Sequence, residues 1–289
     1  MKKKLKYYFQ KALKEKWALG HFNFSNLEIL RAIITAAKRL KAPVIVGTSE
    51  GESKFFGLEQ AVALTKIYRE ATGLPIFLNL DHGKSFEYIK RAIEAGYDAV
   101  QFDGSSLSLK ENIRLTKEVV GYARKFGVLV EGEVGALGTE SSKIYEKPFK
   151  IEEKNLTDPD QAEKFLKETK VDSLAVNIGT FHGVQASGGN PRIRLQRLKE
   201  IKNKAGDTPW VLHGGSGTSE KDIKAAIKLG VVKININTEL RKAYTNSLRK
   251  VLKKRPKEVV PYKYLPEVEK AVQKVVEDKI QLFGSRNRS

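Results

Sequence analysis

Short apolar runs alternate with longer amphipathic segments along most of the chain. In the longer segments, such as residues 27–40 and 219–230, apolar residues recur at the spacing of one helix face. The short runs predict eight strands, at Ala18–Asn23, Val44–Thr48, Ile76–Asp81, Ala99–Asp103, Val128–Glu133, Ser173–Ile178, Trp210–His213 and Val232–Asn235. This alternation is typical of parallel strands joined by crossover helices, and eight such units predict an α/β fold, the (β/α)8 TIM barrel.

Three segments fall outside this regular alternation. An amphipathic segment before the first strand and another at residues 265–284 predict extra N-terminal and C-terminal helices, the latter covering either the barrel or a partner subunit. Residues 134–156 form a long irregular segment rich in glycine and serine, and long loops in compact domains are often active-site lids. Because no linker composition interrupts the chain, we expect residues 1–289 to form a single domain.

The composition narrows the classes of function. Lys and Arg number 53 against 34 Asp and Glu, a net charge of +19 that would suit either nucleic acid or phosphorylated metabolites. The lysines are spread over the expected helices without a cluster or an aromatic platform, so we expect no nucleic-acid partner. The absence of cysteine leaves His, Asp and Glu as the strong metal ligands. No apolar stretch approaches the roughly 20 residues that span a bilayer, and the first residues do not resemble a secretory leader, so we expect a cytoplasmic protein without membrane contact.

Polar residues stand at the end of every expected strand. They are, in order, Asn23, Ser49, Asp81 with His82, Asp103, Glu131 with Glu133, His182, His213 and Asn235. In a TIM barrel the carboxyl ends of the strands meet at one mouth, where the active site lies. The sequence therefore predicts that these side chains converge there.

Three of the four histidines follow expected strands three, six and seven. Three neutral imidazoles with an open fourth position are what a catalytic Zn²⁺ requires to act as a Lewis acid. A single histidine would more often be structural, but equivalent positions in the barrel favour a metal site built from His82, His182 and His213. His21 lies inside the first strand, and we interpret it as a structural residue.

Acidic residues surround the expected metal position. Glu131 and Glu133 are two residues apart on one strand and share a face, so two unpaired carboxylates would be costly without a cation nearby. Either a metal ion or Lys233 on the last strand could neutralise them, and the two possibilities are compatible. Asp103 could be a metal ligand or a turn former at the strand end.

A glycine-rich turn follows the seventh strand. Gly214, Gly215, Ser216 and Gly217 can expose backbone N–H groups just before a helix that Ser219 caps. Such a turn suits a phosphate, because no Cβ blocks close approach and the amides donate hydrogen bonds. Further contacts are expected from neighbouring segments, at Asn235, Asn237, Thr238, Gly179 and Gly183.

Six motifs follow one another along the chain: LNLDHG, FDGSSLSLKENI, VEGEVGALGTE, VNIGTFHG, VLHGGSG and KININTELR. In their order and spacing they resemble the motifs of the class II, metal-dependent fructose-bisphosphate and tagatose-bisphosphate aldolases. The resemblance extends from Trp17 to Ser285.

The resemblance implies a reaction and the residues for it. It implies that His82, His182 and His213 bind zinc, with Asp103 and Glu133 near an alternative or second metal position. Asp81 would handle the proton of the C4 hydroxyl of a ketose bisphosphate, while the metal polarises the C2 carbonyl. The products would be dihydroxyacetone phosphate and glyceraldehyde 3-phosphate, in glycolysis and gluconeogenesis. The residues that would hold the substrate are Asn23, Ser49, Gly183, Gly214, Gly215, Ser216, Asn235, Asn237 and Thr238. A monovalent cation (Na⁺ or K⁺) and a homodimer or homotetramer are also in keeping with the family.

Three positions depart from the family pattern. Ala186 stands where a phosphate-binding lysine is frequent, Asn237 stands where fructose-type members often have aspartate, and Glu140 is the nearest acid for proton transfer at the triose carbon but lies out of register. Tagatose 1,6-bisphosphate is therefore the alternative substrate. Rival functions are a zinc hydrolase on the same barrel, a class I aldolase that uses Lys233 as a Schiff base, and a non-catalytic basic binding protein.

Overall fold

Eight parallel strands close into a barrel in the computed structural model, which describes residues 4–135, 144–146, 151–186 and 190–289. The strand order around the barrel is β1-β10-β9-β7-β5-β4-β3-β2, and each neighbouring pair is parallel. The barrel strands are β1 (Leu19–Asn23), β2 (Val44–Ser49), β3 (Ile76–Gly83), β4 (Ala99–Phe102), β5 (Leu129–Val134), β7 (Ser173–Val176), β9 (Trp210–Leu212) and β10 (Val231–Ile236). The (β/α)8 prediction is confirmed, and the boundaries of all eight expected strands are within two residues of those observed.

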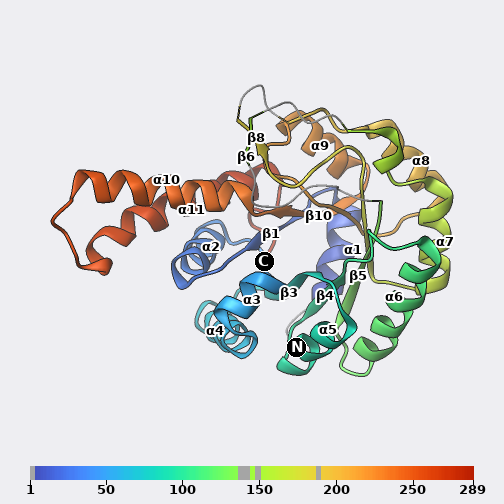
Figure 1. The fold of residues 1–289 in the computed structure, drawn as a ribbon, viewed down its shortest axis with the longest axis horizontal. Coiled ribbons are helices and arrows are strands. Elements are labelled where there is room, and N and C mark those ends of the chain that lie inside the picture. Colours follow the sequence, from blue (N-terminus) through green and yellow to red (C-terminus); the bar gives the residue numbers. More distant parts are fainter. Residues whose placement is uncertain (1–3, 136–143, 147–150, 187–189) are drawn as a thin grey trace.

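Helices surround the barrel (Figure 1). They are α1 (Leu5–Glu15), α2 (Leu27–Leu40), α3 (Glu50–Phe56), α4 (Leu58–Thr72), α5 (Phe86–Ala95), α6 (Leu109–Arg124), α7 (Pro159–Thr169), α8 (Leu195–Ala205), α9 (Glu220–Lys228), α10 (Thr238–Lys254) and α11 (Pro261–Leu282). Smaller elements are the 3-10 turn η1 (Glu153–Asn155) and a two-stranded sheet of β6 (Ile144–Tyr145) and β8 (Val184–Gln185). Many helices begin at a side chain that accepts a backbone N–H, and Ser219 caps α9 in this way, as expected.

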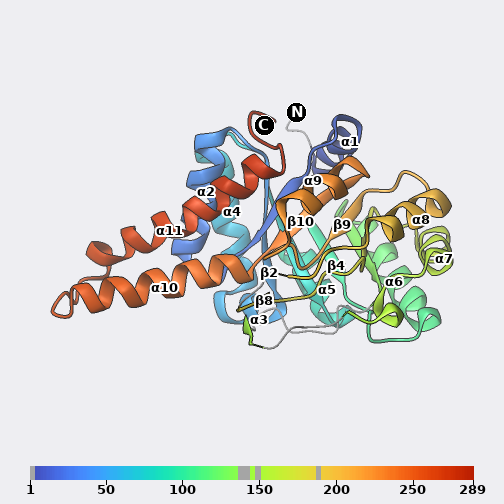
Figure 2. The same cartoon turned by 90° about the horizontal axis from the view of Figure 1, so that it is seen from above.

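The extra terminal helices occupy different places. Helix α1 packs its buried face, including Tyr8 and Phe9, against Phe77 and Val232 of the barrel strands, so it covers the N-terminal mouth. Helices α10 and α11 lie side by side, and their connecting turn extends well beyond the barrel in both views (Figures 1 and 2). Helix α11 also packs on α2. In the described part of the chain, no helix is long and apolar enough to cross a membrane.

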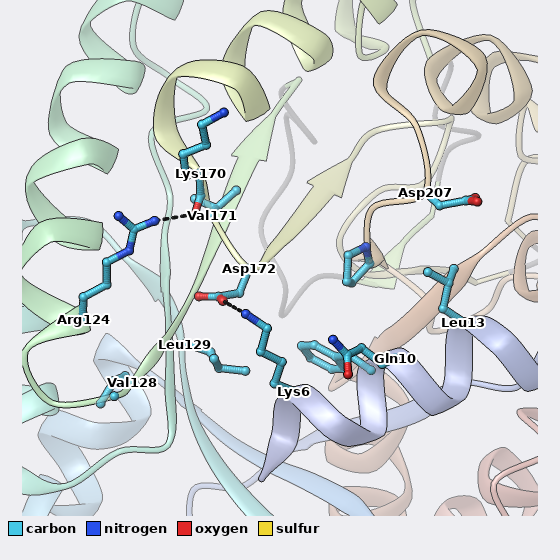
Figure 3. A pocket seen from close by; sticks show the side chains of 13 residues that line it. Lys6, Gln10, Leu13, Arg124, Val128, Leu129, Lys170, Val171, Asp172 and Asp207 are labelled. Atoms are coloured by element: carbon cyan, nitrogen blue, oxygen red, sulfur yellow. Dashed lines mark hydrogen bonds and ion pairs between the residues drawn. The ribbon is translucent and has the colours of Figure 1, made fainter.

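A cavity of about 490 Å³ lies beside α1 at the N-terminal mouth (Figure 3). Two of its basic side chains have partners within the protein: Lys6 Nζ lies 3.6 Å from Asp172 Oδ1, and Arg124 Nη2 donates to the carbonyl of Lys170 at 3.3 Å. Those polar residues expected to form the site that the structure describes stand at the opposite mouth, because they follow the carboxyl ends of the strands.

Candidate active site

Three imidazoles converge at the C-terminal mouth of the barrel. His82 lies near the end of β3, His182 follows β7, and His213 comes directly after β9. The ring centroid of His82 lies 4.7 Å from that of His182 and 4.8 Å from that of His213. One nitrogen from each ring lies within 4.8 Å of the other two, so the three rings could share one metal ion.

The local backbone of β3 accounts for the direction of His82. The pairing of β3 with β4 shifts register between Leu80 and Gly83, and His82 adopts a left-handed φ of 51° at this point. Its backbone N–H donates to Gln101 Oε1 of β4 at 2.9 Å. Because a left-handed conformation is unfavourable for a residue with a Cβ, the surrounding sheet must hold His82 in place.

Carboxylates fix which nitrogen faces the centre in two of the three rings, those of His82 and His213. Asp103 Oδ2 lies 2.9 Å from His82 Nδ1, and Glu131 Oε1 lies 2.8 Å from His213 Nε2. This arrangement leaves His82 Nε2 and His213 Nδ1 facing each other at 3.2 Å. Carboxylates that orient the far nitrogen are usual behind metal-binding histidines, because they set the tautomer and strengthen the donor.

The electrostatics of the histidines favour a cation between them. Burial opposes a charge on His82, but the nearby carboxylates of Asp81, Asp103 and Glu133 outweigh it and raise the pKa of His82 to about 10. For His213, burial is the largest influence and lowers the pKa, so this ring is neutral. The carboxylates around His82 therefore create a negative potential that a metal ion could neutralise in place of a proton.

Glu131 and Glu133 share the inner face of β5 but have different partners. Lys233 Nζ lies 2.7 Å from Glu131 Oε2, with both side chains buried, so the lysine neutralises this carboxylate. Glu133 accepts from Gln101 Nε2 at 2.5 Å, and its pKa is raised by burial and by Asp103. Asp103 and Glu133 form a second possible metal-binding group with His82.

Asp81 is an ionised carboxylate between two asparagine amides. Asn23 Nδ2 donates to its Oδ2 at 3.0 Å, and Asn235 Nδ2 donates to its Oδ1 at 2.9 Å. Burial alone would raise the pKa of Asp81, but nearby groups such as His82 and Lys233 lower it well below its usual range. An ionised carboxylate beside the histidines is able to accept a proton.

A narrow cavity of about 20 Å³ brings most of the expected site residues together. It is lined by Asn23, Asp81, His82, His182, Gly183, His213, Gly214, Ser216, Asn235, Asn237 and Thr238. Ser49 and Gly215 are not among the lining residues. Ser49 instead caps α3 through its hydroxyl oxygen, and the N–H of Gly215 donates to the carbonyl of Asn235, so both residues have partners within the protein.

Of the other residues that the sequence singled out, Glu140 lies outside the part of the chain that the structure describes. His21 is fully buried, and burial lowers its pKa to about 3, as expected of a structural residue. Glu52, which we did not identify from the sequence, places a buried carboxylate next to Asn23 at 2.9 Å. The spacing of Ser49 and Glu52 matches a capping box, and this was the available signal.

Known proteins are similar to this chain in sequence and in fold along its whole length. The sequence matches the family described as "Fructose-bisphosphate aldolase class-II" over residues 3–288. A fructose-bisphosphate aldolase of Geobacillus stearothermophilus is 37% identical over 99% of this chain and 98% of its own length, and one of Thermus caldophilus is 38% identical over 97% of both. The crystal structure of the YdjI aldolase from Escherichia coli K12 superposes with a TM-score of 0.85 at 33% identity, covering 100% of this chain and 99% of that one. The chain therefore belongs to the class II fructose-bisphosphate aldolase family, and it is a lyase.

Proposed function

We propose that this protein is a zinc-dependent aldolase that reversibly cleaves fructose 1,6-bisphosphate to dihydroxyacetone phosphate and glyceraldehyde 3-phosphate in glycolysis and gluconeogenesis. The observation that carries the proposal is the convergence of three imidazole nitrogens beside the ionised carboxylate of Asp81. The names of the relatives favour the fructose substrate. The family match over residues 3–288 supports treating the chain as one catalytic domain.

In this proposal His82, His182 and His213 hold the zinc ion. The donor set fits, because three imidazoles are a usual ligand set for catalytic zinc and carboxylates hold the outer nitrogens of His82 and His213. When bound, zinc would polarise the C2 carbonyl and stabilise the negative charge that develops on its oxygen as the C3–C4 bond breaks. Asp103 and Glu133 would provide an alternative position for the metal.

Asp81 is the proposed base for the C4 hydroxyl. The hydroxyl proton passes to Asp81, and the C4–O bond becomes the carbonyl of glyceraldehyde 3-phosphate. The electron pair of the C3–C4 bond remains on C3, in the half that becomes dihydroxyacetone phosphate. The amides of Asn23 and Asn235 occupy one position on each carboxylate oxygen and so fix its plane. A separate acid must then return a proton to C3, and Glu140 stays a prediction for that step.

The triose phosphate would be held by Gly183, Gly214, Ser216, Asn235 and Thr238, which line the same cavity as the histidines. A Cβ on Gly214 would lie 2.4 Å from the carbonyl oxygen of Phe181, so only glycine fits this close approach between the loops that carry His182 and His213. With Ala186 in place of a lysine, backbone donors and hydroxyls would carry more of the phosphate binding.

The proposal is tested by measuring triose phosphate release from fructose 1,6-bisphosphate and tagatose 1,6-bisphosphate in parallel. Cleavage that a chelator abolishes and zinc restores supports the metal-dependent reaction. The sugar with the larger kcat/KM of the two is the preferred substrate. Asp81→Ala should lose most of its turnover while still binding zinc. A rate within a few-fold of the parent would show that Asp81 is not the base. Absence of cleavage of either sugar by zinc-loaded protein would refute the proposed function.

Assembly and ion requirement form a second part of the proposal. We expect a homodimer or homotetramer, because the α10–α11 hairpin extends beyond the barrel and exposes Val259 in its connecting turn and Tyr262 at the start of α11, at 82% and 76%. Light scattering of the purified protein measures the mass of the assembly, and a monomer at micromolar concentration would contradict the expectation. Activity in Na⁺ or K⁺ compared with a bulky organic cation tests the expected monovalent ion.

A further inference from the structure

Glu52 is a buried carboxylate that the proposed reaction does not use directly. It lies in the first turn of α3, and its side chain is 5% exposed. It forms a capping box with Ser49, in which its Oε2 accepts the backbone N–H of Ser49 at 2.8 Å. A capping contact needs only one oxygen at a helix end, so it does not account for the other partners of this carboxylate.

Both oxygens of Glu52 have partners from distant parts of the chain. Oε2 also accepts from Asn23 Nδ2 of β1 at 2.9 Å. Oε1 accepts from Arg241 Nη2 at 2.6 Å and from Asn237 Nδ2 at 3.3 Å, both at the start of α10. The guanidinium of Arg241 compensates a carboxylate that would be costly to bury alone.

The contact with Asn23 links Glu52 to Asp81. Asn23 has two amide hydrogens, and its nitrogen lies 2.9 Å from Glu52 Oε2 and 3.0 Å from Asp81 Oδ2. Two carboxylates on the same nitrogen fix the amide plane, since a flipped amide would place its oxygen against both negative charges. Without Glu52, one of the two acceptors that hold Asn23 would be lost.

We propose that Glu52, held by Arg241, is a positioning residue that acts through Asn23 to fix the carboxylate of Asp81. This inference rests on the proposed function. Because Asp81 is assigned to the C4 hydroxyl, Glu52 affects carbon–carbon cleavage and does not affect the handling of the triose phosphate. Zinc binding by the three histidines is likewise independent of Glu52, since it contacts none of them among the described residues.

The experiment compares two reactions of the zinc-loaded enzyme. One is cleavage of fructose 1,6-bisphosphate, and the other is exchange of the C3 proton of dihydroxyacetone phosphate with solvent deuterium. Glu52→Ala should lower kcat for cleavage by about 10- to 100-fold, because small misplacements of a reacting group have effects of this size. Its zinc content and proton exchange should stay within about three-fold of the parent, and Glu52→Gln should have a higher kcat than Glu52→Ala because its amide oxygen can still accept from Asn23.

A double-mutant cycle separates positioning from simple loss of structure. If Glu52 acts through Asn23, Glu52→Ala should change kcat by less than about three-fold in an Asn23→Ala background. The matched control is Ser53→Ala in the same helix, which loses hydrogen bonds to the carbonyl of Ser49 and to Tyr88 but has no contact with Asn23. This control should leave kcat within about two-fold of the parent.

The outcomes distinguish the two claims. A parent enzyme that neither exchanges the C3 proton nor cleaves the sugar would refute the proposed function. An active parent in which Glu52→Ala reduces kcat equally in both backgrounds, or reduces exchange as much as cleavage, would overturn the positioning role. Should Glu52→Ala fail to fold, the same cycle is measured with Glu52→Met, which removes the carboxylate oxygens that accept from Asn23 but keeps a side chain of similar length. A crystal structure of Glu52→Ala gives a reading independent of activity: an unchanged contact between Asn23 Nδ2 and Asp81 Oδ2 in that variant would also overturn the inference.

Discussion

Replacing Gly214 by alanine tests the close approach of two loops that the active site requires. Gly214 follows His213 and has a left-handed φ of 63°. A Cβ at this position would lie 2.4 Å from the carbonyl oxygen of Phe181 and 2.8 Å from its carbonyl carbon. Phe181 precedes His182, so the added methyl group would push apart the segments that carry two of the three histidines.

The magnitude follows from two contributions. The left-handed conformation itself costs about 1–2 kcal/mol for a residue with a Cβ. Relieving the contact with a rigid backbone atom requires a shift of about 1 Å, and a misplacement of that size can reduce a rate by about 100-fold. Gly73→Ala is the matched control, because Gly73 has a φ of 70° at the end of α4 and, among the described residues, no heavy atom would lie within 4 Å of its Cβ.

The assays are urea unfolding, zinc affinity by competition with a coloured chelator, and sugar cleavage. Both variants should lose about 1–2 kcal/mol of unfolding free energy from the backbone conformation. Only Gly214→Ala should also bind zinc at least about 10-fold more weakly and lose most of its turnover. If the two variants have the same zinc affinity and the same kcat, the argument from the Gly214–Phe181 approach is wrong.

Three further predictions concern buried charged side chains. Lys233→Met leaves Glu131 buried without its cation and should cost about 3–5 kcal/mol of unfolding free energy. The exposed control Lys224→Met should cost about 0.5 kcal/mol. Equal losses in the two variants would contradict the role of the ion pair. The same pairing predicts that borohydride with substrate traps no adduct on Lys233, and a trapped adduct would restore the Schiff-base alternative. Burial alone would raise the pKa of Asp222, but the guanidinium of Arg192 outweighs burial and lowers it. The ionised carboxylate therefore stabilises the fold at pH values above its unfolded pKa of about 3.9. This stabilisation is lost as the pH falls through the lower pKa of the folded state. The unfolding free energy of the parent should therefore decrease more between pH 5 and pH 3 than that of Asp222→Asn, and parallel curves would contradict the shift.

The barrel could be predicted because its information is local. Each strand is an apolar run and each helix has its own apolar face, so alternation along the chain specifies the architecture without knowledge of distant contacts. The convergence of His82, His182 and His213 followed from the same rule, since the ends of parallel strands meet at one mouth. The ion pair between Lys233 and Glu131 was one of two possibilities that the shared face of β5 allowed.

Features that depend on long-range side-chain geometry were not predictable in the same way. Glu52 meets Asn23 and Arg241 across 29 and 189 positions of sequence, and no local pattern specifies such pairs. The left-handed backbone of His82 arises from the register shift between β3 and β4. Gly215 was expected to offer its amide to phosphate, but the pairing of that amide with the carbonyl of Asn235 depends on how the loop packs on β10.

The zinc content of the purified protein is the most direct test of the metal site. We predict that the parent chain binds a single zinc ion through imidazole nitrogens, as measured by elemental analysis and X-ray absorption. His213→Ala should lose this ion and the cleavage activity while keeping the circular dichroism of the parent. A parent protein that takes up no zinc, or a His213→Ala variant that keeps a full complement of it, would contradict the account.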